Sequence, residues 1–238
     1  NLRTLSRAQG ITYGEVLAWV MEAAAEAQGS SGTRTCLILQ IPREEPLEVA
    51  EEIVSLAISA FGPLVRGIDL AGNEVDYPPA LFKAPFDRAR RAGVHITVHA
   101  GEWVGADSVC SAIMDLHPDR IGHGIRAIES SEVLRSLTQE GIPLEVCPTS
   151  NVQTGAVRAL DAHPLRELLS QQVRVTLNTD DPSIFGSTLS DETAVCVRCL
   201  GIAQTQVYRM LRSSVEAAFI PDEERDQLRD RIRAGLEP

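Results

Sequence analysis

The stretch VRVTLNTDDP, residues 173–182, leads from a short run of β-branched and apolar residues into two adjacent aspartates and a proline. Residues of this kind are typical of a strand covered on both faces. Asp180 and Asp181 then stand together at the end of that strand, where like charges repel and the ionisation of a shielded carboxyl group is costly. A divalent cation removes this conflict, because one carboxylate can bind it while the other accepts a hydrogen bond from water held beside it.

Other segments resemble this strand, and all of them are short and apolar. The strands that we predict occupy residues 35–41, 65–70, 95–100, 120–124, 142–147 and 173–178. Helix-like segments alternate with them, and repeated strand–helix units predict an α/β fold with a parallel sheet and helices outside it. This alternation alone is compatible with a doubly wound open sheet and with a closed eight-stranded barrel.

The helix-like segments have recognisable ends. Thr12 and Glu15 have the spacing of a capping box, and Pro46 stands where a first helical turn would begin. Gly93 and Gly141 each follow a helical run, as glycines that end helices do. These signals place the helices between the predicted strands.

Unusual polar residues stand at the carboxyl ends of the predicted strands, and this favours the barrel. They are Asp69, Gly72, His99, Gly101, Glu102, His123, Asp180 and Asp181. In a barrel these strand ends meet at one mouth, where such folds carry their chemistry. Histidine and aspartate together suit zinc, and a catalytic zinc keeps one position open for water.

Four motifs carry a family resemblance when they are taken in order. VHAGE (98–102), RIGHG (120–124), CPTSN (147–151) and LNTDDP (177–182) resemble the adenosine deaminase family, and DLAGNE (69–74) is similar to the loop that faces the purine in that family. The resemblance implies a (β/α)₈ TIM barrel of the metal-dependent hydrolase type with one Zn²⁺. It also implies hydrolytic deamination of a small-molecule purine nucleoside, adenosine or deoxyadenosine, to inosine or deoxyinosine and ammonia.

The resemblance also assigns roles to single residues. It makes Glu102, His123 and Asp181 catalytic, His99 and Asp180 metal ligands, and Gly72 and Asp69 substrate contacts. Glu102 would protonate the purine N1, and shielding from solvent can keep a glutamate protonated near neutral pH. His123 would orient and deprotonate the attacking water, and Asp181 would accept a second hydrogen bond from it.

The sequence departs from the family pattern in one respect. The family's first strand carries a His-x-His pair that gives two further zinc ligands, and no His-x-His occurs in this sequence. We therefore expect those two histidines, and the first two strand–helix units, to lie upstream of Asn1. Residues 1–238 would then form a single incomplete barrel domain, about strands three to eight and the C-terminal helices. Such a fragment would be inactive and marginally stable alone.

Composition excludes several other classes of protein. The net charge of −11 argues against a nucleic-acid-binding surface, which usually appears as a basic stripe. No apolar run reaches the length of a membrane span. The cysteines are odd in number and scattered, which favours reduced thiols in a cytoplasm over a disulfide framework. They are Cys36, Cys110, Cys147, Cys196 and Cys199.

Alternative interpretations remain open at this point. Adenine, or a modified adenine nucleoside such as aminodeoxyfutalosine, would use the same chemistry. A noncatalytic barrel-derived binding protein would be expected to have lost Glu102, His123 or the aspartate pair, and all are present. We interpret the remaining histidines, His95, His117 and His163, as structural. The Cys196/Cys199 pair, which has metal-site spacing, we interpret as two incidental thiols in a helix.

Overall fold

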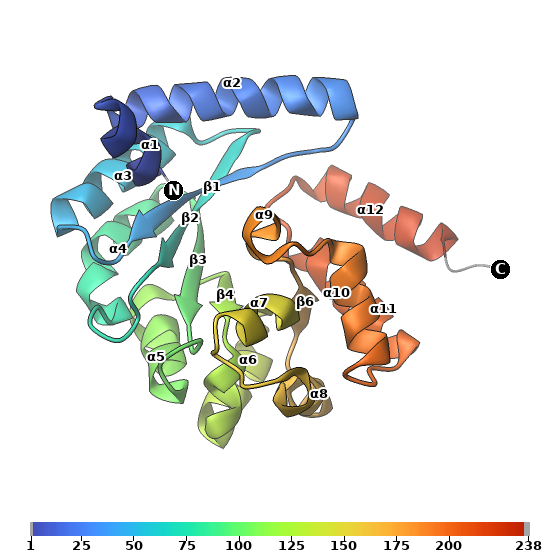
Figure 1. The fold of residues 1–238 in the computed structure, drawn as a ribbon. Coiled ribbons are helices and arrows are strands. Elements are labelled where there is room, and N and C mark those ends of the chain that lie inside the picture. The colour runs from blue at the N-terminus through green and yellow to red at the C-terminus, as the bar shows by residue number, and fades with distance from the viewer. Residues whose placement is uncertain (1, 236–238) are drawn as a thin grey trace.

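The computed structural model describes residues 2–235, and its centre is one curved sheet of six parallel strands (Figure 1). The strands are β1 Leu37–Pro42, β2 Val65–Ala71, β3 His95–Ala100, β4 Arg120–His123, β5 Leu144–Val146 and β6 Val175–Leu177. All six predicted strands are confirmed. The last two are shorter than predicted, at three residues each.

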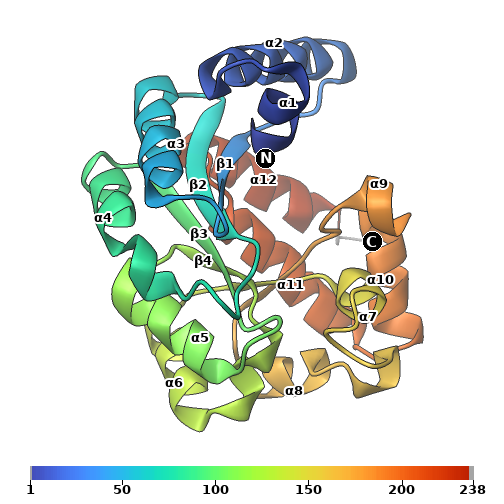
Figure 2. The same cartoon turned by 60° about the vertical axis from the view of Figure 1, so that its left-hand side comes forward.

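Helices precede, separate and follow these strands. The α-helices are α1 Leu2–Gln9, α2 Tyr13–Ser31, α3 Leu47–Ala60, α4 Lys83–Arg91, α5 Ala106–Ser111, α6 Ser131–Glu140, α7 Pro148–Gln153, α8 Leu165–Ser170, α9 Pro182–Phe185, α10 Leu189–Arg198, α11 Gln204–Ala217 and α12 Asp222–Ala234. Shorter helical turns are η1 Pro79–Phe82, η2 Ala112–Leu116, η3 Ile125–Glu129 and η4 Leu160–Ala162. Figures 1 and 2 show α3 to α6 in series along the outer side of the sheet and α10 to α12 grouped beyond β6.

The predicted helix signals act as expected. The Thr12 side chain accepts from the Glu15 backbone N–H at 3.2 Å, and the Glu15 carboxylate accepts from the Thr12 backbone N–H at 2.9 Å. This capping box begins α2. Pro46 is the residue before α3, and Gly141 ends α6 in the left-handed conformation with φ 69°. Local sequence therefore sets where these helices begin and end.

Strand order decides between the two architectures that the sequence left open. The sheet runs β1-β2-β3-β4-β5-β6, and each strand pairs with its neighbour in the chain. A doubly wound sheet reverses its strand order at a switch point, whereas a barrel adds strands in sequence. The described residues therefore form a sequential run of barrel units. Within residues 2–235 the run does not close, and β1 and β6 are its edge strands.

The core lies between the sheet and the outer helices. Ile68 and Val98 in the strands are fully buried, as are Ile53 of α3 and Phe86 of α4. The strands lack polar alternation because both of their faces are covered. Among residues 2–235, no helix combines the length and the apolar character needed to cross a membrane.

A single aromatic side chain covers the amino ends of several strands. Phe219, in the segment between α11 and α12, stacks on His95 at the start of β3 with ring centroids 4.3 Å apart. The Arg120 guanidinium at the start of β4 lies 3.7 Å from the Phe219 ring centroid. The Arg66 side chain of β2 donates to the Phe219 carbonyl at 2.8 Å. We call Phe219, His95, Arg120 and Arg66 the basal cluster.

Candidate active site

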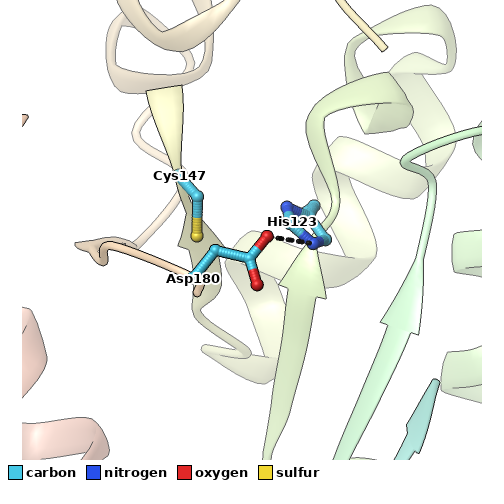
Figure 3. A group of neighbouring side chains, drawn as sticks. All are labelled: His123, Cys147 and Asp180. Atoms are coloured by element: carbon cyan, nitrogen blue, oxygen red, sulfur yellow. Dashed lines mark ion pairs between the residues drawn. The ribbon is translucent and has the colours of Figure 1, made fainter. Parts of the chain in front are cut away.

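The carboxyl ends of β3 to β6 bring the predicted polar residues together. The rings of His99 and His123 lie edge to face with centroids 5.1 Å apart. The His123 Nε2 atom lies 3.8 Å from an Asp180 carboxylate oxygen, and Figure 3 shows Cys147 beside them. Four consecutive strands therefore supply one constellation, as expected for a barrel mouth.

Backbone strain marks two of these strand ends. His123 has φ 56° and Asp180 has φ 57°, and neither residue is a glycine. Non-glycine residues in this left-handed region are uncommon and gather at functional sites. Gly122 has a related role, because a Cβ at that position would lie 2.7 Å from the His99 Nδ1 atom. The RIGHG motif thus leaves room for one histidine and turns the other into the mouth.

Asp69 holds the ring of His99. Its Oδ1 atom lies 3.0 Å from His99 Nδ1, so Nε2 is the ring nitrogen available to a metal ion. Burial lowers the pKa of His99, but nearby carboxylates, Asp69 foremost, outweigh burial and raise that pKa to about 9. A carboxylate behind a histidine is the usual support of a metal ligand. We predicted Asp69 as a substrate contact. The structure shows that it supports His99, and its contact with substrate stays a prediction.

Glu102 lies in an environment that favours its protonated form. Burial, and then the charges of Asp180 and Glu74, raise the pKa of Glu102 to about 7 against the opposing effect of His99. Its Oε2 atom lies 3.5 Å from His123 Nε2. Burial, followed by the charge on His99, lowers the pKa of His123 to about 3. At neutral pH the site thus pairs a neutral imidazole with a carboxyl group able to donate a proton.

A buried carboxylate fixes the loop that carries Glu102. Glu74 accepts hydrogen bonds from four consecutive backbone N–H groups, those of Gly101, Glu102 at 3.2 Å, Trp103 at 3.0 Å and Val104 at 3.3 Å. A carboxylate bound in this way gains charge-assisted hydrogen bonds and restrains the backbone that donates them. Glu74 belongs to the DLAGNE motif, yet sequence reasoning did not single it out.

The CPTSN motif places two further polar side chains at the mouth, on α7. The Ser150 hydroxyl donates to Asp180 Oδ2 at 2.6 Å. The Asn151 amide nitrogen lies 3.1 Å from His123 Nδ1, and the Asn151 amide oxygen lies 3.2 Å from His163 Nε2. His163, which we interpreted as structural, therefore contacts the mouth through Asn151.

Sequence reasoning also missed Arg43, which follows β1 and is fully buried. Its guanidinium donates to the backbone carbonyl of His99 and, at 2.5 Å, to that of Tyr77. Burial lowers the pKa of Arg43, and the charges of Glu74 and Asp69 oppose this effect. A charged residue directly after an apolar strand was the available signal. Arg43 links β1 to the strand end that carries His99.

Two cavities meet at the constellation, and His99, His123 and Asp180 line both. The larger one, which we call the cleft, has a volume of about 570 Å³ and is also lined by Glu102, Asp181 and Gly72. The smaller one, of about 370 Å³, is lined further by Glu145, Cys147 and Leu177. The cleft therefore holds the predicted acid, the second aspartate and the loop glycine together.

The donors present fit a zinc ion only in part. His99 Nε2 and the Asp180 carboxylate have suitable chemistry, and Asp69 supports the histidine. The donor atoms of His123, Cys147 and Asp180 also lie within 4.8 Å of one another (Figure 3). Burial and then nearby acids raise the pKa of the Cys147 thiol well above its usual range. The ring of His99, in contrast, is held by a carboxylate, which is the usual support of a metal ligand.

Comparison with known proteins gives consistent likenesses. The family model for adenosine deaminase matches residues 3–235. The chain is 38% identical over 231 residues to an aminodeoxyfutalosine deaminase of Streptomyces coelicolor, covering 95% of this chain and 59% of that protein. It is 36% identical over 215 residues to an adenosine deaminase of Clostridium acetobutylicum, covering 90% of this chain and 64% of that protein. The chain thus spans about three fifths of the length of these curated relatives.

Solved structures show the same likeness in three dimensions. An adenine deaminase from Arthrobacter aurescens superposes with a TM-score of 0.90 at 31% identity, covering 98% of this chain and 71% of that one. A Burkhoderia ambifaria amidohydrolase with bound Zn superposes with a TM-score of 0.85 at 26% identity, covering 96% of this chain and 67% of that one. These likenesses agree with the sequential strand order of the sheet.

Proposed function

The chain belongs to the adenosine deaminase family and has the fold of the TIM-barrel amidohydrolases, and from this we propose that the full-length protein is a zinc-dependent purine deaminase. The reaction that we propose is hydrolytic removal of ammonia from C6 of adenosine or deoxyadenosine. One observation carries the proposal: Glu102, whose pKa is raised to about 7, lines the same cleft as His99 and Asp180.

Four residues of the cleft suit steps of this chemistry. Attack on C6 requires an electron-poor ring, and a protonated Glu102 can supply this by donating its proton to the purine N1. Asp181 lines the same cleft and would accept a hydrogen bond from the attacking water, which His123 would orient. Gly72, on the cleft wall, would offer its backbone amide to the purine.

Zinc would be held by His99 and Asp180, together with two histidines that we expect upstream of Asn1. When bound, it would make water nucleophilic near neutral pH by lowering the pKa of that water. The similar Burkhoderia ambifaria structure, which has bound Zn, supports this choice of metal. The partial donor set of residues 2–235 is compatible with it.

Adenine and aminodeoxyfutalosine are the alternative substrates. The Arthrobacter aurescens adenine deaminase and the Streptomyces coelicolor aminodeoxyfutalosine deaminase are similar to this chain. All three reactions remove an amino group from an adenine ring, so the Glu102 chemistry does not separate them. The loop at residues 69–74 resembles that of nucleoside enzymes, which favours a nucleoside over free adenine. Among the nucleosides we propose adenosine or deoxyadenosine, and the assay below separates them from aminodeoxyfutalosine.

The test uses purified full-length protein loaded with zinc. Adenosine, deoxyadenosine, adenine and aminodeoxyfutalosine are each followed spectrophotometrically, and metal content is measured by mass spectrometry. We expect about one zinc per active site and the highest kcat/KM with adenosine or deoxyadenosine. His117→Asn, at an exposed site directly after η2, is a control variant and should retain full activity. A zinc-loaded protein that deaminates none of the four compounds would overturn the proposal.

A further inference from the structure

A chain of hydrogen bonds runs from the first turn of α8 to the ring of His123. The Leu165 backbone N–H lies 3.1 Å from His163 Nδ1. His163 Nε2 lies 3.2 Å from the Asn151 amide oxygen, and the Asn151 amide nitrogen lies 3.1 Å from His123 Nδ1. The side chains of His163, Asn151 and His123 are all buried. We call these three side chains the imidazole relay.

The backbone at one end of the relay sets the direction of every bond in it. A backbone N–H can only donate, so His163 Nδ1 must accept, and the single proton of the neutral ring must lie on Nε2. That proton is donated to the Asn151 amide oxygen. The Asn151 amide group is thereby oriented with its NH₂ toward His123, so His123 Nδ1 accepts and the His123 proton lies on Nε2.

We propose that Asn151 and His163 are positioning residues that hold His123 as the Nε2–H tautomer in the cleft. This inference rests on the proposed function and deepens it. In this tautomer His123 Nε2 is a hydrogen-bond donor, 3.5 Å from the Glu102 carboxyl group and 3.8 Å from the Asp180 carboxylate. The lone pair needed to take a proton from water is on Nδ1, where Asn151 occupies it. The family resemblance gives His123 two tasks, to orient the attacking water and to take a proton from it. This tautomer can orient the water, but it cannot take the proton.

A purely structural role for the relay is the competing explanation. Apolar side chains of similar shape would fill the same space without polar atoms that destabilise the fold when they are buried unpaired. The relay instead keeps three polar side chains in series, and its open end lies in the cleft. A structural role predicts changes in stability only, whereas the tautomer role predicts a change in where the His123 proton lies.

The first test reads the tautomer directly in the full-length, zinc-loaded protein. Histidine is labelled with ¹⁵N, and long-range ¹H–¹⁵N NMR spectra distinguish Nδ1–H from Nε2–H rings. The His123 signals are assigned by their loss in His123→Gln. We expect Nε2–H in the unmodified protein. An Nδ1–H ring for His123 would overturn the inference.

Asn151→Asp replaces the amide nitrogen that faces His123 Nδ1 with an oxygen, so a hydrogen-bond donor becomes an acceptor. A carboxylate can only accept, so His123 Nδ1 must then carry a proton, and the NMR signal should change to that of a ring protonated at Nδ1. We expect kcat to fall by about 10²-fold or more while KM changes by less than about threefold, since geometry for the reaction is lost rather than binding. Gln171→Glu, an exposed amide-to-acid change directly after α8, is the matched control and should change neither. An unchanged tautomer in a folded Asn151→Asp protein would overturn the inference.

His163→Phe gives an independent test if Asn151→Asp does not fold. It keeps an aromatic ring but removes the link to the Leu165 backbone, so Asn151 is free to rotate and His123 should show both tautomers. A His123 ring that stays entirely Nε2–H in this variant would overturn the role of His163. The tautomer is read without substrate, so its result is distinct from that of the deamination assay. An Nε2–H ring in a protein that deaminates no purine would count against the proposed function alone.

Discussion

The two ends of the same six strands differ in kind. At the carboxyl ends, His123 and Asp180 have left-handed backbones, and Glu102 has a pKa raised to about 7. At the amino ends, which we call the base, Phe219 contacts His95 and Arg120. Arg66 and Arg120 donate to backbone carbonyls there, and Arg120 also pairs with Glu145 at 3.1 Å. The mouth thus has left-handed backbones and an acid with a raised pKa, whereas ring packing and arginine contacts hold the base together. Barrels generally separate chemistry and stability in this way, so substitutions at the two ends should affect different measurements.

The largest effect expected at the mouth is that of Glu102→Gln. Glutamine keeps the shape of the side chain but cannot donate a carboxyl proton to the purine N1. In the full-length protein we expect kcat to fall by about 10²–10⁴-fold. Zinc content and melting temperature should stay as in the unmodified protein, because Glu102 is not one of the proposed ligands. Loss of zinc with this change would contradict the role of Glu102, because it would show that Glu102 is needed to bind the metal.

Phe219→Ala should have the largest effect at the base, and on stability instead of activity. Removing a buried phenylalanine ring typically costs about 3–5 kcal/mol, and here the ring also contacts His95 and Arg120. Urea unfolding of the full-length protein should show this loss, with kcat per folded molecule unchanged at low temperature.

Phe219→Leu is the matched control for the base, since it keeps most of the apolar volume and should cost less than Phe219→Ala. A fall in kcat without a fall in stability in either variant would show that the two ends of the strands are coupled. The comparison between mouth and base would then not hold.

Glu74→Gln tests the connection between loop geometry and the acid. An amide cannot accept from four backbone N–H groups as a carboxylate does, so the loop at residues 101–104 should loosen. We expect kcat to fall by about 10–10²-fold, the equivalent of about 1–3 kcal/mol. Asp76→Asn is the matched control, because Asp76 is exposed on the same loop and its carboxylate accepts from Asn73. Equal losses of kcat in the two variants would show that Glu74 has no specific role in restraining the loop at residues 101–104.

Much of the mouth could be predicted because its signals are local. A strand pattern followed by His99, His123 or Asp180 marks a strand end, and parallel strands bring their ends together. The contact between Asp69 and His99 could also have been predicted once the strands were paired in parallel. In the parallel register Asp69 pairs with Thr97, and His99 is two residues further along the same face of β3. The strand period therefore points Asp69 toward His99.

The remaining features depend on contacts between distant segments. Glu74 reaches backbone groups 27 to 30 residues away, and Asn151 joins His123 across 28 residues and His163 across 12. No local period relates these positions. Each residue is also ordinary when it is taken alone: an acid in a loop, an asparagine within a short helix and a histidine before a proline. Only the packed structure shows that all of them act on Glu102 or His123.

The pH dependence of the reaction should show the smallest and most specific effect. Glu102 must be protonated to donate, and its pKa is raised to about 7, so the active form is present at lower pH and is lost as pH rises through about 7. We expect kcat/KM to be roughly tenfold lower at pH 8 than at its plateau. Glu74 contributes to raising this pKa, so Glu74→Gln should move the midpoint to lower pH, whereas Asp76→Asn should leave it in place. A rate that stays flat from pH 6 to about 9 would mean that Glu102 does not donate the proton. The raised pKa would then reflect only burial and neighbouring acids, and the mouth would differ from the base in strain but not in proton chemistry.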